Sequence, residues 1–257
     1  MARIHSSAVV DPGAKLADDV EIGPYCVIGG EVELGRGVSV GPHAVIVGRT
    51  SIGPRTRIFP FTVIGEAPQL LEADPGTRLL IGADNVIREF CSIHAGSGAG
   101  GDATRLGDGN FLLNNVHVAH DCRIGDRCVL ASLSAFAGHV VIEDHAVIGA
   151  MVGVHQFVRI GEHSFTGAAT RLSKDVPPFS RVAGQRAHWI GVNAVGLRRR
   201  SFAPEKIDEL RRAFRVLFRS KLRLAAAIDR VALEHAGTPE VERLLHFLAT
   251  SRRGITR

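Results

Sequence analysis

The sequence predicts a mainly β protein, a parallel β-helix of six-residue repeats, with an α-helical domain at its C-terminal end. Two observations carry this prediction. A large aliphatic residue, replaced by phenylalanine at Phe136 and by threonine at Thr166, recurs at every sixth position in three runs, and an amphipathic helical pattern follows Pro204. The 26 repeat positions are Ile4, Val10, Leu16, Ile22, Ile28, Leu34, Val40, Ile46, Ile52, Ile58 and Ile64, then Ile81, Ile87 and Ile93, then Leu106, Leu112, Val118, Ile124, Leu130, Phe136, Ile142, Ile148, Val154, Ile160, Thr166 and Leu172.

Each repeat has the composition of one short strand and a corner. Glycine often follows the aliphatic residue, as at Gly23 and Gly107, and the fourth position after it is small or β-branched. Three such repeats close one triangular coil, whose inward side chains stack into ladders. All four cysteines fall at that fourth position, so we expect buried, free and unreactive thiols.

Breaks in the period divide the chain. We expect a β-helix over residues 1–178, with loop insertions near 65–80 and 97–105, because the period ends at the Asp-Val-Pro-Pro of 175–178. Residues 179–200 then form a linker that carries basic side chains, and residues 201–257 form the helical domain. Its first helix starts after Pro204, a second covers about 224–233, and a third has Thr238 as its N-cap and Pro239 at its first position.

Composition excludes several classes of protein. With 45% hydrophobic and 22% charged residues in 257, the chain is too apolar to be disordered. No apolar run approaches the ~18 residues of a membrane span, and the first residues lack the apolar stretch of a secretory signal, so we expect a cytoplasmic protein. The charge is uneven, with a net of +8 from Gly196 onward and −3 before it.

Polar residues gather on one face of the later coils. Seven of the twelve histidines lie between positions 94 and 163. With three repeats in a coil, His120 shares a column with Gly138 and Gln156, and both insertions leave from the same face. Loops beside a polar patch commonly carry function. The predicted site contains His117, His120, Asp121, Gly138, His139, His155 and Gln156.

Several local motifs resemble one family of enzymes. They are Val-His-Val-Ala-His-Asp-Cys at 116–122, Ala-Gly-His at 137–139, Val-His-Gln-Phe at 154–157, Asp-Val-Pro-Pro at 175–178, Gly-Val-Asn at 191–193 and Gly-Leu-Arg-Arg-Arg at 196–200. Together they resemble the UDP-N-acetylglucosamine acyltransferases, which catalyse the first step of lipid A biosynthesis. The resemblance covers nearly the whole chain and implies that the β-helix is left-handed.

The resemblance also implies roles for individual residues. His120 matches the general base that takes the proton from the sugar 3-hydroxyl as it attacks the thioester of a 3-hydroxyacyl carrier protein. Asp121 matches the residue that orients this base, and the backbone N–H of Gly138 matches the donor to the oxyanion. The other matches contact substrate: Gln69, His117, His139, His155 and Gln156 in the acyl and sugar region, and Asn193, Arg199 and Arg200 at the nucleotide.

Partners follow from the same resemblance. We expect an acidic acyl carrier protein as donor, steered by the basic C-terminal part, and a UDP-sugar as acceptor. We also expect a homotrimer with sites between neighbouring subunits, and no nucleic acid partner, no cofactor and no metal. Three alternatives stay open: a γ-class carbonic anhydrase with three histidines on zinc, an acetyl-CoA-dependent sugar acetyltransferase, and a non-catalytic solenoid.

Some positions depart from the family pattern. Where the family has Asp and Lys after Gln69, this chain has Leu70 and Glu72, and the family's Glu near Asn193 is Val195. We therefore hypothesise that a UDP-sugar with a 3-amino group is the better acceptor, with UDP-N-acetylglucosamine at a weaker KM as the leading alternative. Ala168 replaces the usual Gly near the end of the acyl tail, which leaves acyl length open.

Overall fold

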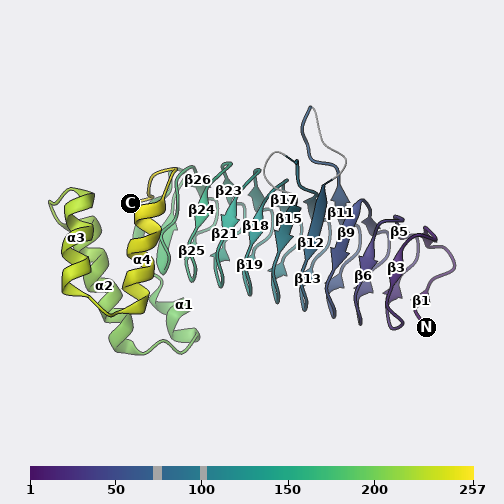
Figure 1. The fold of residues 1–257 in the computed structure, drawn as a ribbon, viewed down its shortest axis with the longest axis horizontal. Coiled ribbons are helices and arrows are strands. Elements are labelled where there is room, and N and C mark those ends of the chain that lie inside the picture. The colour runs from purple at the N-terminus through teal and green to yellow at the C-terminus, as the bar shows by residue number, and fades with distance from the viewer. Residues whose placement is uncertain (72–76, 99–102) are drawn as a thin grey trace.

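The computed structural model describes residues 1–71, 77–98 and 103–257. The chain forms a long triangular prism of stacked coils, with helices gathered at one end and the N-terminus at the other (Figure 1). Every predicted repeat position lies in one of the strands β1 to β26, so the period of six is confirmed. A short strand is enough for each side because the neighbouring coils supply its hydrogen bonds.

Three parallel sheets make the sides of the prism. One has nine strands: β2 (Val9–Val10), β5 (Val27–Ile28), β8 (Val45–Ile46), β11 (Val63–Glu66), β14 (Ser92–His94), β17 (His117–Val118), β20 (Ala135–Phe136), β23 (Gly153–Val154) and β26 (Arg171–Leu172). Another has eight: β3 (Lys15–Leu16), β6 (Glu33–Leu34), β9 (Arg49–Ile52), β12 (Arg78–Ile81), β15 (Ala103–Leu106), β18 (Arg123–Ile124), β21 (Val141–Ile142) and β24 (Arg159–Ile160).

The third sheet has eleven strands, of which the last two lie beyond the repeats. They are β1 (Arg3–Ile4), β4 (Glu21–Ile22), β7 (Ser39–Val40), β10 (Arg57–Ile58), β13 (Val86–Ile87), β16 (Phe111–Leu112), β19 (Val129–Leu130), β22 (Val147–Ile148), β25 (Phe165–Thr166), β27 (Ser180–Ala183) and β28 (His188–Val192).

The register advances by three repeats from one coil to the next, as the triangular coil predicts. Val27 pairs with Val45, and His117 pairs with Ala135. The core is a stack of inward aliphatic side chains, and it includes all four cysteines. Burial raises the pKa of the Cys122 and Cys128 thiols to about 12, so these groups stay neutral and unreactive, as expected.

Both insertions leave the same edge of the prism. Val63 pairs with Ser92, and Ser92 pairs with His117, so each of these two pairings spans more chain than three repeats provide. The extra residues connect β11 to β12 and β14 to β15. Both connections therefore run between the nine-stranded and the eight-stranded sheet. We call this corner of the prism the site edge; in the three coils that concern us it comprises residues 119–122, 137–140 and 155–158.

Residues 179–200, expected as a linker, extend the prism instead. Strand β27 pairs in parallel with β25, and β28 folds back antiparallel on β27. Helix α1 (Ala194–Arg199) follows directly. These strands lack the six-residue period because they complete the last coil and turn the chain outward to the helices.

Three further helices cover this end of the prism: α2 (Pro204–Arg219), α3 (Leu224–Glu234) and α4 (Pro239–Thr250). They form a second apolar core that includes Phe179, Leu210, Phe214 and Leu244. The positions predicted from Pro204, Thr238 and Pro239 agree with the observed starts, although the Thr238 hydroxyl donates to Glu209 (2.9 Å) rather than capping its helix.

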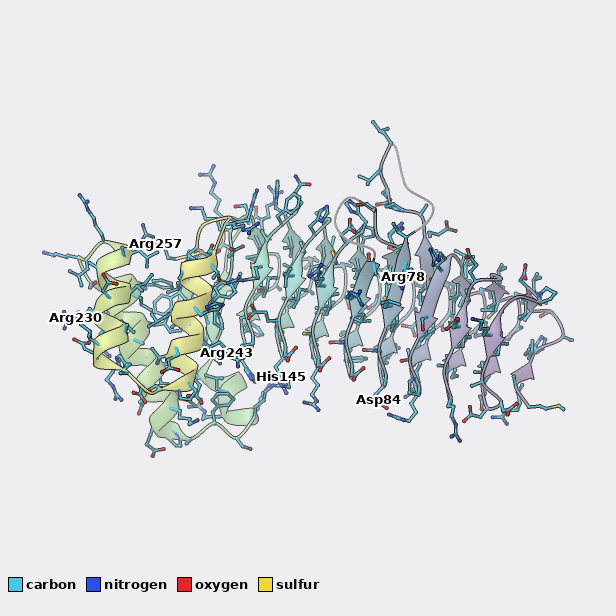
Figure 2. The ribbon with its side chains drawn as sticks, viewed as in Figure 1. Arg78, Asp84, His145, Arg230, Arg243 and Arg257 are labelled. Carbon is cyan, nitrogen blue, oxygen red and sulfur yellow. The ribbon has the colours of Figure 1, made fainter. Side chains whose placement is uncertain are left out.

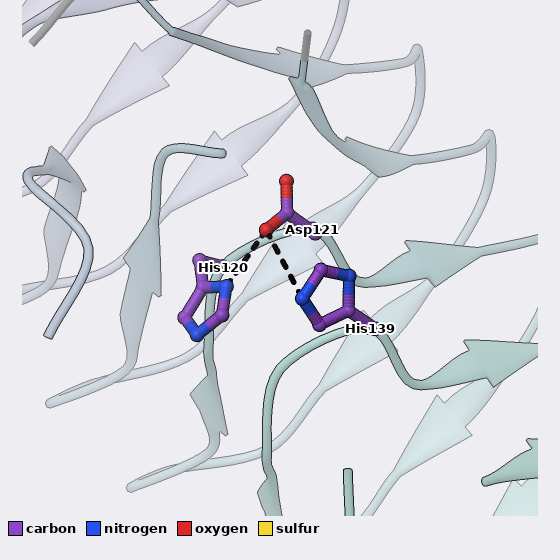
Figure 3. Close-up of side chains that lie close together, drawn as sticks. All are labelled: His120, Asp121 and His139. Carbon is purple, nitrogen blue, oxygen red and sulfur yellow. Dashed lines mark hydrogen bonds and ion pairs between the residues drawn. The ribbon is translucent and has the colours of Figure 1, made fainter. Parts of the chain in front are cut away.

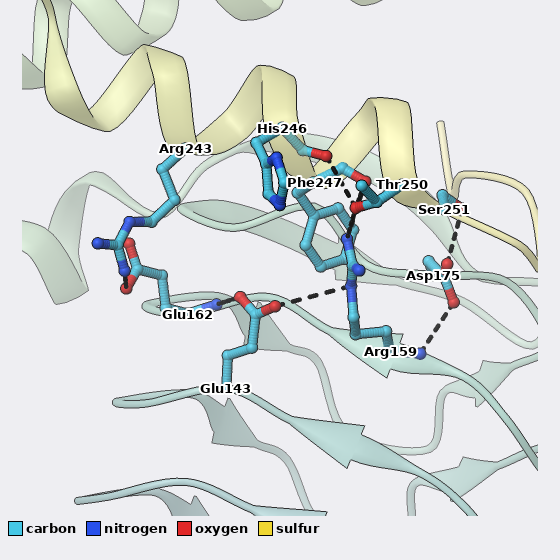
Figure 4. Close-up of polar contacts among 9 residues, drawn as sticks. All are labelled: Glu143, Arg159, Glu162, Asp175, Arg243, His246, Phe247, Thr250 and Ser251. Carbon is cyan, nitrogen blue, oxygen red and sulfur yellow. Dashed lines mark hydrogen bonds and ion pairs between the residues drawn. The ribbon is translucent and has the colours of Figure 1, made fainter.

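Polar contacts fasten α4 to the last coils (Figure 4). The Arg159 guanidinium donates to the Phe247 carbonyl oxygen (2.8 Å) and to Thr250 Oγ1 (3.0 Å), and lies 3.8 Å from the centre of the Phe247 ring. Arg243 pairs with Glu162 at 2.7 Å. Figure 2 shows Arg243 and His145 where the helices meet the prism. The helical domain is thus held against one end of the β-helix.

Candidate active site

The turns of the site edge stack as the triangular coil predicts. The N–H of His139 donates to the His120 carbonyl oxygen (3.0 Å), and the N–H of Phe157 donates to the Gly138 carbonyl oxygen (3.2 Å). Asp121, His139 and Phe157 occupy equivalent turn positions with φ near +60°. The structure therefore places His120 with Gly138, and Asp121 with His139, on adjacent coils.

Asp121 lies between two imidazole rings (Figure 3). Its Oδ2 atom is 2.7 Å from His120 Nδ1 and 3.6 Å from His139 Nε2. The Asp121 side chain is 1% exposed, and those of His120 and His139 are 13% and 22% exposed. Because a carboxylate accepts, His120 carries its proton on Nδ1, and Nε2 is the atom available as a base.

The connection from β14 to β15 anchors this carboxylate. Ser97 donates to Asp121 twice, from Oγ to Oδ2 (2.5 Å) and from its backbone N–H to Oδ1 (3.0 Å). The backbone N–H of Asp121 donates to Thr104 Oγ1 (2.8 Å). Burial raises the pKa of Asp121, but the donors from Ser97 and His120 outweigh it and hold the pKa below its usual value. Asp121 is therefore an anion beside His120 at neutral pH.

Gly138 leaves room for the His120 ring. A Cβ on Gly138 would lie 2.4 Å from His120 Cε1 and 2.6 Å from Nε2, closer than atoms can approach. Its N–H donates to no backbone carbonyl among the residues that the structure describes. The same turn position is proline at Pro24, Pro42 and Pro54, where no N–H is needed. The Gly138 N–H thus lies outside the sheet ladders, on the residue that packs against the His120 ring.

The other residues predicted to contact the sugar or acyl group lie at or beside the site edge and have separate surroundings. His117 Nδ1 lies 2.8 Å from Ser92 Oγ, and its ring meets that of His94 edge-on at 5.3 Å. Burial, together with the neighbouring His94, lowers the pKa of His117. His155 Nδ1 is 3.2 Å from a guanidinium nitrogen of Arg253. Gln69 and Gln156 are exposed.

Contacts from Ser97, Thr104 and Arg253 were not predicted from the sequence. Ser97 and Thr104 lie within the second insertion, where no period assigns them to a column. Arg253 reaches the site edge because the last residues fold back, with Ile255 bridging to Asp175. The Ser-Gly-Ala-Gly-Gly composition of 97–101 indicates a loop but gives no sign of its contact with Asp121.

The predicted nucleotide residues lie at a different edge, which we call the helix edge: residues 125–128, 143–146 and 161–164, between the eight-stranded and eleven-stranded sheets. Arg200 donates to the Arg127 carbonyl oxygen (3.4 Å), and Arg199 is exposed. Asn193 is 6% exposed, caps α1 through the Gly196 N–H (3.2 Å) and donates to the His163 carbonyl oxygen (2.9 Å). Arg200 and Asn193 therefore contact a different edge of their own chain from the one that carries His120.

His145 and His163 also lie at the helix edge. Their rings stack with centres 4.6 Å apart. Burial, then the neighbouring His145 and Arg200, lowers the pKa of His163 to about 4, so this ring is neutral. The sequence predicts both histidines to be solvent-facing residues on another face. They do lie at a different edge from His120, but the second part of the prediction is wrong, because both rings are half-buried.

The described residues that differ from the family pattern are apolar and exposed. Leu70 is 44% exposed and Val195, on α1, is 45% exposed. Ala168 lies on an exposed turn between β25 and β26. Glu72 falls outside the described residues. The loss of polar side chains at 70 and 195 thus leaves open surface and no buried gap.

One group in the described part of the chain could hold a metal ion: His120, Asp121 and His139, with ligand atoms within 4.8 Å of one another. It contains two histidines and a carboxylate rather than the three histidines of the carbonic anhydrase alternative. The carboxylate already accepts from Ser97 and His120. Hydrogen bonds within the group account for its geometry.

Comparisons with known proteins agree with one another. The profile described as "Udp N-acetylglucosamine O-acyltransferase; Domain 2" matches residues 175–256, and that of the bacterial transferase hexapeptide matches 1–36 and 103–138. The acyl-[acyl-carrier-protein]–UDP-N-acetylglucosamine O-acyltransferase of Thiobacillus denitrificans is 49% identical, and that of Thermodesulfovibrio yellowstonii is 46% identical, each over 100% of both chains.

Solved structures give the same result. LpxA from Acinetobacter baumannii has a TM-score of 0.96 at 41% identity and covers 99% of both chains. The UDP-N-acetylglucosamine acyltransferase of Francisella novicida has a TM-score of 0.94 at 38% identity, covering 99% of this chain and 94% of that one. The fold is thus the left-handed parallel β-helix with a C-terminal helical part. No helix in the described ranges could cross a membrane.

The stacked His120, Asp121 and Gly138, the basic α1 and these whole-length matches point the same way. The chain belongs to the acyl-[acyl-carrier-protein]–UDP-N-acetylglucosamine O-acyltransferase family.

Proposed function

We propose that this protein transfers a 3-hydroxyacyl chain from acyl carrier protein to the 3-hydroxyl of UDP-N-acetylglucosamine, the first step of lipid A biosynthesis. The observation that carries the proposal is the His120–Asp121 pair with the Gly138 N–H beside it, in a chain that matches O-acyltransferases over its full length. We place the reaction in the cytoplasm, where acyl carrier protein thioesters are made.

In the proposed reaction His120 is the general base. Its Nε2 takes the proton of the sugar 3-hydroxyl while the oxygen attacks the thioester carbonyl carbon. The carbonyl oxygen gains negative charge, and the Gly138 N–H donates to it. When the C–S bond breaks, the imidazolium returns its proton to the thiolate of the carrier's prosthetic arm. Asp121 keeps the proton of His120 on Nδ1 and stabilises the imidazolium, as in other base–carboxylate pairs.

The separation of the two edges supports a site shared between subunits. His120 lies at the site edge, whereas Arg200 lies at the helix edge of the same prism. A homotrimer that brings one subunit's helix edge to its neighbour's site edge would unite base and nucleotide contacts. In that arrangement Gln69, His117, His139, His155 and Gln156 contact the sugar and acyl groups, while Asn193, Arg199 and Arg200 contact the nucleotide.

Alanine at both Arg199 and Arg200 is expected to raise the KM for UDP-N-acetylglucosamine by about 10-fold or more and to leave kcat within a few fold. The reason is that a charge-assisted contact to a phosphate is worth about 1.5–3 kcal/mol, and it acts on ground and transition states alike. Arg198→Ala is the matched control, because Arg198 is a neighbouring exposed arginine on α1. Steady-state kinetics with varied UDP-sugar measure the effect. Equal KM values for the double variant and the control would contradict the assignment.

The acceptor and donor are tested together with purified protein. We expect turnover of a 3-hydroxyacyl carrier protein with UDP-N-acetylglucosamine, detected as an ester by mass spectrometry, and none with acetyl-CoA. The competing acceptor is the 3-amino analogue, which the apolar Leu70 and Val195 favour because they remove polar contacts to the ordinary sugar. A higher kcat/KM for the amino sugar would replace the ester by an amide as the natural product. Absence of transfer to either sugar would refute the acyltransferase itself.

A further inference from the structure

Residues near the two ends of the second insertion, Ser97 and Thr104, contact Asp121 of the proposed catalytic pair. Ser97 is only 8% exposed, and it donates to both oxygens of Asp121. Toward the other end of the insertion, Thr104 Oγ1 accepts from the Asp121 N–H at this turn. Because the buried Ser97 hydroxyl already donates to Asp121, we expect it to make no contact with the sugar or the thioester.

The backbone of the insertion approaches the carboxylate closely. A Cβ on Gly96 would lie 3.1 Å from Asp121 Oδ1 and 3.1 Å from the Ala103 backbone, tighter than most real contacts. The glycine thus lets the chain pass close enough for the Ser97 N–H to reach Oδ1. The Asp121 carboxylate therefore has one oxygen fixed by backbone and the other by the Ser97 hydroxyl.

The Ser97 hydroxyl matters because the Asp121 carboxylate lies near two imidazole rings, either of which could be its partner. Oδ2 lies 2.7 Å from His120 Nδ1 but also 3.6 Å from His139 Nε2 (Figure 3). A carboxylate held only by the Ser97 N–H can turn about its Cβ–Cγ bond and share Oδ2 with His139. The hydroxyl bond at 2.5 Å opposes that rotation.

We propose that Ser97 is a positioning residue of the acyl transfer, which fixes the Asp121 carboxylate so that it orients His120 rather than His139. This inference rests on the proposed function, because it assigns Ser97 a role through the catalytic pair. It also assigns a role to the first residue of the second insertion: Ser97, from the preceding coil, supports the carboxylate that orients the base. Losing the hydroxyl misaligns the base in the transition state without removing any substrate contact.

The test compares Ser97→Ala with Ser97→Thr, which keeps a hydroxyl on Cβ. For Ser97→Ala we expect kcat to fall by about 10- to 100-fold, as for other misplaced catalytic groups, while KM for the UDP-sugar stays within twofold. Ser97→Thr should recover most of kcat. Ser134→Ala is the matched control, since that serine is also buried at a coil corner, where its hydroxyl donates to the Ala131 carbonyl oxygen (2.8 Å). The control should keep the wild-type kcat.

A pH profile adds a second readout. Donation from Ser97 helps to hold the pKa of Asp121 below its usual value. Its loss raises that pKa, so the carboxylate is protonated at a higher pH and activity fails earlier as the pH falls. The acid limb of Ser97→Ala should move to higher pH, and that of Ser97→Thr should not. A merely structural role would lower the thermal midpoint of Ser97→Ala without moving this limb.

Nitrogen-15 spectra of histidine-labelled protein separate this inference from the proposed function. In the wild type His120 should be the Nδ1–H tautomer, with its signal assigned through His120→Asn, and Ser97→Ala should broaden or shift that signal. A wild type that transfers no acyl group would refute the function, while the tautomer would still report on Ser97. Wild-type kcat in Ser97→Ala, equal losses in the two Ser97 variants, or an unchanged His120 signal would each overturn the positioning role.

Discussion

Replacing His120 with alanine is expected to lower kcat by about 100-fold or more, because the variant loses its general base. The thermal unfolding midpoint should stay close to that of the wild type. His120 lies on a turn of the site edge outside the aliphatic ladders, and its hydrogen-bonding partner Asp121 keeps the two donors of Ser97. Steady-state kinetics and thermal unfolding measure the two quantities on the same preparations.

His43→Ala is the control for this variant. His43 also lies on a turn of the prism, where its ring stacks between Tyr25 and Phe61 at 5.0 and 4.9 Å. That column lies at the corner between the eleven-stranded and nine-stranded sheets, so kcat should not change. Wild-type turnover in His120→Ala would remove the histidine from the proposed mechanism, and an equal loss in His43→Ala would show that the effect is not specific.

Alanine at Gly138 is expected to lower kcat by about 100-fold, as displacement of a reacting group can do. The new methyl group would meet His120 Cε1 at 2.4 Å and Nε2 at 2.6 Å, so the ring must move. The φ of Gly138 is not positive, and alanine accepts this backbone conformation. The amide N–H is also retained. The loss therefore reports on the position of the base, and the pH-independent kcat is the quantity to measure.

Gly153→Ala provides the comparison. Gly153 lies on β23 of the same nine-stranded sheet, and a Cβ there would meet nothing within 4 Å. It should keep wild-type kcat and stability. If Gly138→Ala had the same kcat as Gly153→Ala, the His120 ring could not occupy its proposed catalytic position over this glycine.

Most of the fold could be predicted because the repeat determines which residues of successive coils lie side by side, although these residues are distant in the sequence. Once Ile28 and Ile46 are assigned the same place in successive coils, their pairing across one coil follows from the period alone. The strands β27 and β28 escaped prediction for the opposite reason. They carry no repeat, and the pairing of Phe165 with Arg181 depends on the end of the prism and not on a local pattern.

The same distinction applies to the candidate site. The column arithmetic placed Gly138 over His120 and His139 beside Asp121, and the geometry agrees. It could not place Ser97, because an insertion interrupts the count of repeats per coil. Nor could it reveal that the Asn193 side chain is already engaged by Gly196 and His163, since the match to the family motif carries no information on local hydrogen bonds.

Because the coils stack regularly, the number of coils can change without moving the residues of the candidate site. His120 and Asp121, the proposed catalytic pair, come from one coil, Gly138 from the next and Ser97 from the one before, and each coil touches only its neighbours. The coils before Val47 lie outside this unit. A whole coil could therefore be gained or lost there in evolution as a module, and the remaining coils would keep their register. Deletions that are not multiples of six residues would shift the inward face and disturb the core. In this architecture selection can change the size of the enzyme while the reacting atoms stay where they are.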